Sequence, residues 1–379
     1  MSDCMWRYLR FSLYASLLLC VLIVASCGAG QVARLEGERV DMRHSSLLEI
    51  IACDGYTVVD IKNPWGKGVL DRYILVPSDS AVPLGLPEGT VVRTPLKDVV
   101  LFSGVHAMLF EELGVLPAVA GVCDSRYLYS KGVKRGLEDG TIHDCGSSLN
   151  VNSEVVARIN PDAIFVLPYE NGGYGKLDRF SYPLVKCADY MESSPLGCAE
   201  WVRFYGRLLG CAERSDSIFD VVCSEYEALC SKVAAVERRP RLMCELKSSS
   251  AWYVPGGKST MGQMYKDAGA DYLFAGHDVT GSVPLSVEVV LETASDADIW
   301  LLKYNSTIDK TCQDLLGEYD GYAHFKPFRE KSIYACNTHR KNIFEEAAFH
   351  PEKLLKELVA LFHPYMFQEY KTVYYEKMR

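Results

Sequence analysis

The segment 99–122, VVLFSGVHAMLFEELGVLPAVAGV, decides the fold class of this chain. It opens with an apolar run at 99–102, continues with a helical pattern over 105–113 that Gly114 ends, and closes with an apolar run at 118–122. Two short apolar strands on either side of a helix are typical of a βαβ unit, in which the strands pair in parallel. The segment therefore predicts an α/β lobe.

The pattern continues and then recurs. A helix at 153–159 and a strand at 163–167 extend the first lobe. In the second half, strands are predicted at 242–246, 272–275 and 299–302, with helices at 261–268 and 287–293 between them. Two lobes of similar construction follow from this alternation.

Matching positions support an internal repeat. Gly114 and Gly121 have the same separation as Gly269 and Gly276. A second match is the sequence Glu-Val-Val followed, after five residues, by Asp-Ala. It occurs at 154–156 with 162–163 and again at 288–290 with 296–297. The repeat by itself indicates two similar lobes and says nothing about a ligand.

The segment between the lobes has apolar residues at helical spacing from 199 to 238. It predicts one long helix, or two nearly collinear ones with a break at Ser215-Asp216. A helical connector is stiff, so we expect little movement of the lobes. The terminal helix predicted at 351–362 is expected to pack on the second lobe.

The N-terminus reads as an export signal. Arg7 and Arg10 precede a short apolar run at 13–25, and small residues lead to Cys27. This end resembles the lipobox of bacterial lipoproteins, in which that cysteine is diacylated. The resemblance implies lipidation at Cys27 and a protein tethered to a membrane rather than spanning it.

Composition narrows the classes further. The chain has 379 residues and a formal net charge of −9, which argues against a nucleic-acid partner. Of its 14 cysteines, three lie in residues 1–27, and the remaining eleven lack the spacing of a zinc site. We therefore predict no structural metal and no cofactor. Cys223 and Cys230, seven residues apart on one predicted helix, cannot pair with each other.

These observations predict an α/β fold with two similar lobes, mainly parallel sheets, a joining helix and a small N-terminal β region that we interpret as a hairpin. We divide the chain into a lipoprotein signal segment (1–27), a β-rich extension (28–92), a first lobe (93–198), a linker helix (199–238) and a second lobe with its terminal helix (239–379).

Four short motifs carry a wider resemblance: AGVCD at 120–124, INPDAI at 159–164, GSVPLS at 281–286 and ADIW at 297–300. With the lipobox and the helical linker, residues 95–364 resemble the periplasmic binding proteins of siderophore, haem and cobalamin importers. The resemblance implies a monomeric, lipid-anchored periplasmic protein that holds a small molecule between its lobes. It would deliver this molecule to an ABC permease without changing it chemically. The bound molecule would be an iron chelate (a siderophore complex or haem) or cobalamin.

The resemblance also implies two docking residues. In that family one surface glutamate at the head of a helix in each lobe meets arginines of the membrane subunits, and the matching positions here are Glu154 and Glu288. A plainer interpretation is helix capping, since Asn152 and Ser286 are typical N-caps and an acidic residue in the first turn suits the helix dipole. Both roles are compatible.

The ligand is expected at the carboxyl ends of the strands, where open parallel sheets present their sites. Aromatic faces suit macrocycles and catecholate rings, and cations suit an anionic chelate. For any single tyrosine, a core position with a satisfied hydroxyl is the alternative. The expected contacts are Arg126, Tyr127 and Tyr129; Tyr169, Asn171 and Tyr174; Trp252, Tyr253 and Lys258; and, by family position, Asn337, Phe344 and Glu345.

Other classes stay open as alternatives. A zinc or manganese binding protein would need several histidines to converge, and the candidates His106, His143, His277 and His339 fall on different predicted elements. A lipid-anchored two-lobed enzyme would need a nucleophile or ligand motif, and we find none. The stretch 257–260, GKST, is not a phosphate loop because Trp252 stands where that motif requires glycine.

Overall fold

The computed structural model describes residues 36–379, so the predicted signal segment and Cys27 lie outside the described residues. Within residues 36–379, no helix combines the length and the apolar character needed to cross a membrane. Residues 39–379 form one compact unit, which contains both lobes, the linker and the β-rich extension.

The first lobe is built on a parallel sheet with the order β12-β11-β6-β7-β8. Its strands are β6 (Val99–Leu101), β7 (Val119–Val122), β8 (His143–Asp144), β11 (Ala163–Val166) and β12 (Leu184–Lys186), and its helices are α2 (Gly104–Glu112), α3 (Lys131–Asp139) and α4 (Ser153–Ile159). A small hairpin of β9 (Gly146–Ser147) and β10 (Asn150–Val151) precedes α4. The predicted βαβ unit and its extension are confirmed.

The second lobe has the sheet order β16-β13-β18-β19-β20, in which the first four strands are parallel and β20 is antiparallel. Its strands are β13 (Arg241–Cys244), β16 (Asp271–Tyr272), β18 (Ile299–Tyr304), β19 (Ile333–Asn337) and β20 (Glu376–Lys377), and its helices are α8 (Thr260–Asp267), α9 (Val287–Ala294), α10 (Cys312–Glu318) and α11 (Lys326–Arg329).

The internal repeat holds at the level of topology. The order β7-β6-β11-β12 in the first lobe corresponds to β16-β13-β18-β19 in the second. Gly114 and Gly269 each follow the helix between the first two of these strands and have φ angles of 73° and 79°. This left-handed conformation is costly for residues with a Cβ atom, so glycine ends both helices.

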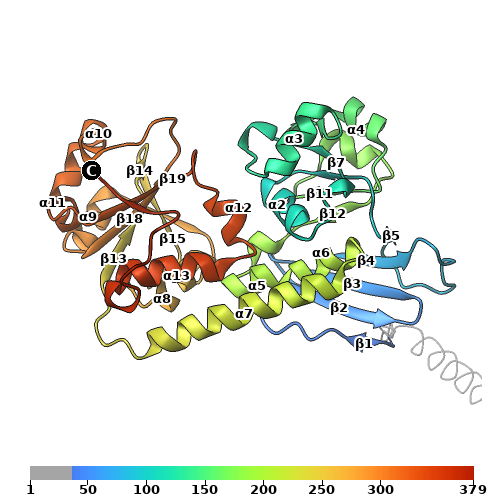
Figure 1. The fold of residues 1–379 in the computed structure, drawn as a ribbon, viewed down its shortest axis with the longest axis horizontal. Helices are drawn as coiled ribbons and strands as arrows, with labels where there is room; N and C mark the ends of the chain where they lie inside the picture. The colour runs from blue at the N-terminus through green and yellow to red at the C-terminus, as the bar shows by residue number, and fades with distance from the viewer. Residues whose placement is uncertain (1–35) are drawn as a thin grey trace, which may run out of the picture. The chain divides into compact units, whose positions relative to one another are not determined.

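The connection between the lobes consists of α5 (Pro195–Glu200), α6 (Val202–Leu208) and α7 (Ala212–Ala234), and α7 runs from beneath the first lobe to the second (Figure 1). The predicted break at Ser215-Asp216 is wrong. Ser215 lies inside α7, where its hydroxyl donates to the carbonyl of Ala212 at 2.8 Å, and the chain instead turns at Gly210, which has a φ of 71°. A serine whose hydroxyl bonds back to the preceding turn is compatible with a helix.

The N-terminal β region is larger than the hairpin we expected. It is a five-stranded sheet of β1 (Glu38–Arg39), β2 (Leu48–Cys53), β3 (Tyr56–Lys62), β4 (Val69–Pro77) and β5 (Thr90–Thr94), in that order. Tyr73 on β4 is fully buried; its hydroxyl donates to the carbonyl of Leu184 and accepts from the amide of Lys186 on β12. The sheet is thereby attached to the edge strand of the first lobe.

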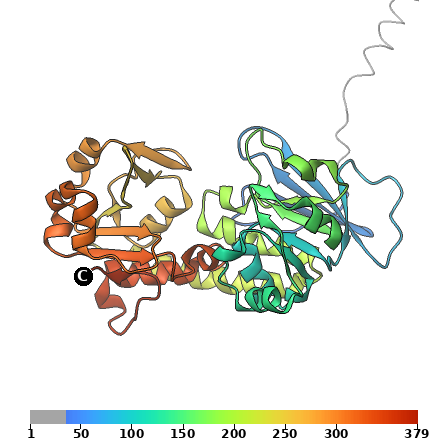
Figure 2. The ribbon, with the colours of Figure 1, turned by 90° about the horizontal axis from the view of Figure 1, so that it is seen from above.

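The last helices connect the two lobes. They are α12 (Ile343–Ala347) and α13 (Pro351–Phe362). α12 contacts α2 of the first lobe, whereas α13 packs on α8 of the second lobe and also on the linker helices α5 and α7. Both helices belong to the red segment that runs between the two lobes in Figure 2. The terminal helix thus reaches the second lobe as expected, but its larger contact is with the linker.

The remaining short elements complete the chain. A three-stranded antiparallel sheet is formed by β14 (Lys247–Ser248), β15 (Ala251–Pro255) and β17 (Ser282–Leu285). Single 3-10 turns are η1 (Leu116–Ala118), η2 (Ser125–Tyr127), η3 (Gly175–Arg179), η4 (Asp189–Met191), η5 (Asp320–His324) and η6 (Pro364–Met366).

Candidate ligand-binding cleft

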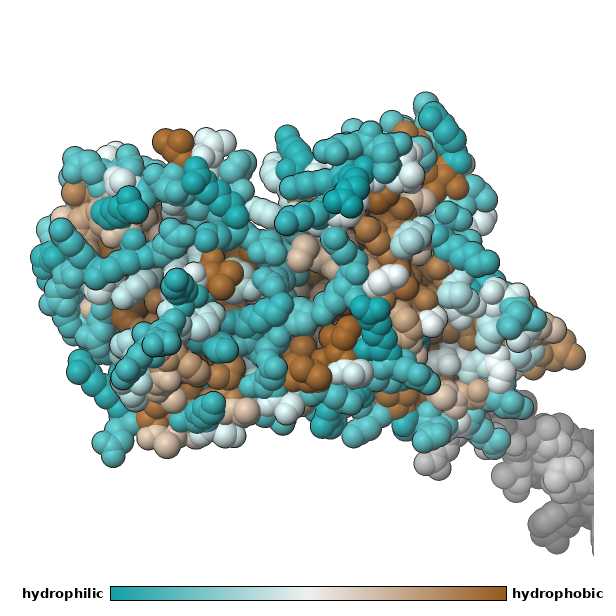
Figure 3. Space-filling view, in the orientation of Figure 1, coloured by the Kyte–Doolittle hydropathy of each residue, from teal (hydrophilic) through white to brown (hydrophobic). Residues whose placement is uncertain are grey.

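A cavity of about 460 Å³ is lined by residues of both lobes, and the surface is hollowed between the lobes (Figure 3). Its walls come from the carboxyl ends of β6, β7, β18 and β19, together with α12. The lining residues are Ser103, Gly104, Val105, Cys123, Asp124, Arg126, Tyr127, Leu128, Tyr129, Lys134, Asn305, Thr338, His339, Lys341, Asn342, Phe344 and Glu345. This position is where parallel sheets present ligands, because the loops after the strands meet there.

The start of α2 forms part of the cavity floor. Ser103 caps the helix by accepting a hydrogen bond from the amide of Val105. A Cβ atom on Gly104 would collide with the carboxylate of Glu345 and lie 3.0 Å from Leu128. Glycine at this position therefore permits the second lobe to approach the first helix of the first lobe.

Two side chains link the lobes directly across the cavity. The hydroxyl of Tyr129, in the first lobe, donates to the carbonyl of Thr338 in the second at 2.5 Å. The carboxylate of Glu345, on α12, accepts from the amide of Tyr129 at 3.2 Å. Tyr129 therefore has contacts to the second lobe through both its backbone and its side chain.

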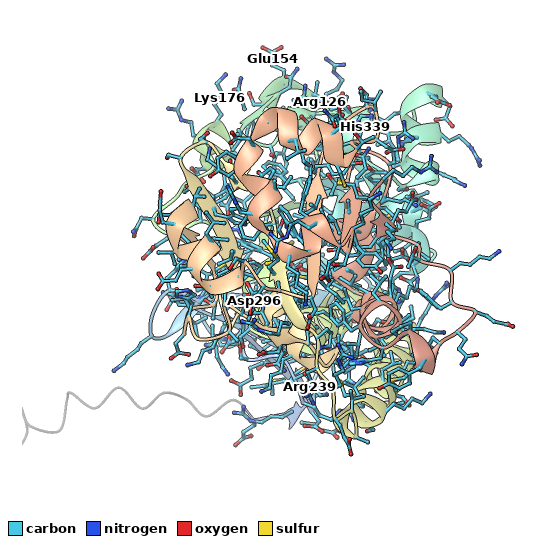
Figure 4. All side chains as sticks on the ribbon, turned by 90° about the vertical axis from the view of Figure 1, so that its left-hand side faces the viewer. Arg126, Glu154, Lys176, Arg239, Asp296 and His339 are labelled. Carbon is cyan, nitrogen blue, oxygen red and sulfur yellow. The ribbon has the colours of Figure 1, made fainter. Side chains whose placement is uncertain are left out.

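Basic side chains line the cavity. Arg126 and Lys134 enter from the first lobe and Lys341 from the second, where Lys341 also pairs with Glu376 at 3.0 Å. His339 lines the cavity as well, and Arg126 and His339 are labelled in Figure 4. The carboxylate of Asp124 is engaged elsewhere, since it accepts from the hydroxyl and the amide of Ser148. The lining is suited to a ligand with negative charge.

Aromatic rings accompany these cations. The Arg126 guanidinium lies 4.6 Å from the centre of the Tyr127 ring, and the Lys134 ammonium lies 5.6 Å from that of Tyr129. Tyr127 and Phe344 are exposed by 59% and 60%, so their faces are available to a bound molecule. Flat apolar surface beside positive charge is suited to a ring system that bears anionic groups.

The carboxyl group of Glu345 has an unusual pKa. Burial raises the pKa to about 7, against the opposing effects of the Tyr129 amide and of Lys134. Its ionisation therefore changes near neutral pH, so the charge of the cavity depends on pH in that range.

Asn337 supports the cavity from below without lining it. It is 5% exposed, and its amide group donates to the carbonyl of Ser306 and to the carboxylate of Asp309. Its side-chain oxygen accepts from the amides of Ser306 and His339. Asn337 thus holds the loops after β18 and β19 together and positions His339.

The structure brings together only part of the predicted site. Arg126, Tyr127, Tyr129, Phe344 and Glu345 line the cavity. The loop after β11 contributes none of its three predicted residues: Tyr169 is exposed, Asn171 takes a left-handed turn with a φ of 55°, and the hydroxyl of Tyr174 donates to the carbonyl of Leu167.

The stretch after β13 that we interpreted as a ligand loop is the strand β15. Trp252 is fully buried, donates to the carbonyl of Cys244 at 2.9 Å and packs on Trp300 and Phe325. Tyr253 points outward from the same strand, and Lys258 is an exposed partner of Asp278. The alternation of buried Trp252, exposed Tyr253 and buried Val254 is the period of a half-buried strand and was the available signal.

Several lining residues were missed by reasoning from the sequence. Ser103 and Gly104 follow β6 and Asn305 follows β18, so the rule about strand ends could have found them. Lys134 and Lys341 lie on a helix face and in a turn, where a surface lysine has no distinguishing pattern. Only the packing of the lobes places these two lysines on one cavity.

The two predicted docking glutamates head equivalent helices. Asn152 caps α4 by accepting from the amides of Glu154 and Val155, and Ser286 caps α9 by accepting from Val289. Both glutamates are exposed, and Glu154 lies at the outer edge of the first lobe (Figure 4). The capping that we considered as the plainer interpretation is present.

Comparison with known proteins assigns the family. A sequence profile described as "Periplasmic binding protein" matches residues 99–338. The chain belongs to this family. Family membership makes it the binding component of a transporter and not an enzyme, so the enzyme alternative is wrong.

Individual relatives agree with the family. An uncharacterised lipoprotein of Methanocaldococcus jannaschii is 26% identical over 323 residues, covering 81% of this chain and 76% of its own. The TroA-like periplasmic binding protein FepB from Veillonella parvula has a TM-score of 0.57 at 18% identity, covering 76% of this chain and 96% of its own. IsdE of S. aureus, complexed with heme, has a TM-score of 0.54 at 18% identity, covering 70% of this chain and 98% of its own. The fold is therefore the TroA-like fold.

Proposed function

We propose that this protein captures an iron chelate (a ferric siderophore or haem) or cobalamin between its lobes and delivers it to an ABC permease. The observation that carries the proposal is the cavity in which Arg126, Lys134 and Lys341 surround the exposed rings of Tyr127 and Phe344. Anionic groups of a ligand would meet the cations while its rings lie on the aromatic faces.

A bare zinc or manganese ion fits the cavity less well. Among the histidines of residues 36–379, only His339 lines the cavity, and Asp124 is already bonded to Ser148. A transition-metal ion needs three or four converging donors, whereas cations such as Lys134 and Lys341 would oppose it. The arrangement of charge thus favours the chelate.

Thermal unfolding with candidate ligands tests the proposal. The protein is heated alone and with haem, cobalamin, cobinamide, several ferric siderophores, Zn²⁺ and Mn²⁺ at matched concentration. One chelate is expected to raise the Tm by several degrees, because a ligand that binds only the folded state stabilises it. The shift should be lost in the double variant Arg126→Ala with Lys341→Ala and kept in Lys176→Ala, an exposed lysine outside the cavity. A shift that persists in the double variant would contradict binding at this cavity.

We further propose that Glu154 and Glu288 dock on the permease. Their exposure at the heads of equivalent helices supports this role. Reversing both charges, Glu154→Arg with Glu288→Arg, should leave ligand affinity unchanged and abolish stimulation of the permease ATPase. Glu138→Arg with Glu292→Arg, two exposed glutamates on α3 and α9, serves as the matched control. Undiminished stimulation by the first pair would refute docking through these residues.

Anchorage at Cys27 on the extracytoplasmic face of a membrane completes the proposal. The lipoprotein relative and the periplasmic family support it. Mass spectrometry of the protein produced in a host that processes lipoproteins should show a diacylated Cys27 as the first residue, and Cys27→Ser should prevent the modification.

A further inference from the structure

A cluster of side chains of the types that bind metals lies outside the cavity, where the β-rich extension meets the linker helix. Sγ of Cys223 lies 3.4 Å from Nε2 of His44, and Oε1 of Glu227 lies 3.8 Å from the same nitrogen. The three donor atoms all lie within 4.8 Å of one another. None of these residues lines the cavity between the lobes.

The backbone holds these donors in place. Cys223 and Glu227 are four residues apart on α7, a spacing that puts two side chains on the same helix face. His44 lies on the segment before β2, where its amide donates to the buried carboxylate of Glu200 at 2.8 Å. The edge of its ring packs on Phe219, with 6.0 Å between the ring centres. The imidazole is therefore fixed above the helix.

The donors converge on a point and do not form a relay. In a nucleophile–histidine–acid relay the two partners bond to different nitrogens of the imidazole. Here Cys223 and Glu227 both face Nε2. A hydrogen bond accounts for the contact of Cys223, but Glu227 at 3.8 Å is beyond hydrogen-bond range. A cation between the three atoms would satisfy all of them.

The distances are close to those of a tetrahedral site. Bonds of about 2.0 Å to nitrogen and oxygen and about 2.3 Å to sulfur place tetrahedral donors roughly 3.3–3.5 Å apart. The separation of Cys223 from His44 fits this range, whereas Glu227 would have to move toward Nε2 by about 0.5 Å, which its exposed side chain permits. Thiolate, imidazole and carboxylate together favour Zn²⁺ and similar transition metals over Mg²⁺ or Ca²⁺. Since Glu227 is 59% exposed, solvent can supply a fourth donor.

A second group of residues in the described part of the chain could also hold a metal ion, but it fits one less well. His106, Cys187 and Asp189 also lie close together, but they are fully buried. The hydroxyl of Tyr205 lies 3.3 Å from His106 and donates to Asp189 at 2.8 Å. Nε2 of His106 and the carboxylate of Asp189 are thus already engaged with Tyr205, although Nδ1 of His106 has no hydrogen-bond partner. Because all three residues are buried, solvent could not complete a coordination shell there.

We infer that His44, Cys223 and Glu227 form a binding site for a zinc-class divalent cation, which fastens the β-rich extension to the linker helix. The site is independent of the chelate proposed for the cavity. Metal binding here would link two segments 179 residues apart in the chain and stabilise the folded state by mass action.

Cobalt titration tests the site. The protein as the cell produces it, purified in detergent under reducing conditions, is titrated with Co²⁺ and then with Zn²⁺. We expect thiolate-to-cobalt absorption in the near ultraviolet and tetrahedral bands in the visible, at one equivalent, with Zn²⁺ displacing both. His44→Gln and Glu227→Gln should each weaken Co²⁺ binding by about 100-fold or more, since even residues behind the ligands change metal affinity by 10–100-fold.

Matched variants separate this site from other thiols and from the cavity. Cys223→Ser should remove the near-ultraviolet absorption, whereas Cys230→Ser, seven residues along the same helix, and Arg126→Ala with Lys341→Ala should retain it. Because Cys223 is buried and its variant could fail to fold, the exposed Glu227 provides the decisive test. Co²⁺ affinity unchanged in both His44→Gln and Glu227→Gln, or bound Co²⁺ without thiolate absorption, would overturn the inference.

Discussion

Glu345 shows how one side chain combines structure and charge in the cleft. It is 8% exposed, fills the space above Gly104 and accepts from the backbone of Tyr129 in the opposite lobe. Burial raises its pKa to about 7, so the carboxyl is neutral in mildly acidic solution and charged in mildly alkaline solution. A negative charge at this position would oppose an anionic ligand.

The first prediction concerns Glu345→Gln. The pKa of Glu345 is higher in the folded protein than in the unfolded chain. Proton binding at Glu345 therefore stabilises the fold fully below about pH 4.5, and this stabilisation is lost as the pH rises through about 7. The free energy of unfolding of the wild type relative to the variant should therefore fall by up to about 3 kcal/mol across that range. Urea unfolding at several pH values measures it, with the exposed Glu330→Gln as control. A constant difference would contradict the raised pKa.

At the scale of elements, buried carboxylates secure the β-rich extension. Glu200, at the end of α5, accepts from the amides of Arg43, His44 and Ser45, at 3.0, 2.8 and 2.7 Å. Glu192 bonds in the same way to the residues that follow, including the amides of Ser46 and Leu47. The segment before β2 has no strand partner for these amides among the described residues, so the two glutamates satisfy them.

The second prediction is that Glu200→Ala destabilises the protein by about 2–5 kcal/mol, because it leaves three partly buried amides without their acceptor. Chemical unfolding measures the loss. Glu213→Ala, an exposed glutamate at the start of α7, should change the free energy of unfolding by less than about 0.5 kcal/mol. Equal stability of the two variants would show that the hydrogen bonds accepted by Glu200 do not stabilise the protein.

At the scale of the whole unit, the lobes are joined by more than the linker. Besides Tyr129 and Glu345, Nε2 of His350 at the head of α13 lies 2.8 Å from the carboxylate of Glu112 at the end of α2. Burial alone would lower the pKa of His350, but its hydrogen bonds to Glu112 and Glu352 outweigh burial and raise the pKa to about 9. These contacts support our prediction that the lobes move little.

The third prediction follows from that pKa. A histidine whose pKa is raised on folding stabilises the protein fully below about pH 6.5, and the effect is lost as the pH rises through about 9. The wild type should exceed His350→Gln in the free energy of unfolding by about 1–3 kcal/mol at pH 6, and by much less above pH 9. Thermal unfolding across this range tests it, with the exposed His324→Gln as control. If the difference does not decline with pH, the ion pair does not stabilise the lobe contact.

Much of the fold could be read from local patterns. Apolar strands alternating with helices predicted both parallel sheets, and Gly114, Gly269, Asn152 and Ser286 marked helix ends where the structure has them. These features depend on residues a few positions apart, whose backbone conformation and hydrogen bonds are decided within one or two turns.

The composition of the sites depended on tertiary structure. Lys134 and Lys341 share a cavity, and His44 meets Cys223, only because sheets and helices distant in the chain pack together. Trp252 is the opposite case. Its position after a predicted strand suggested a ligand contact, but Trp252 lies on β15, which pairs with β17, and its side chain is buried in the core. Periodicity in the sequence tells which face of an element is buried, whereas the register between elements decides which side chains converge.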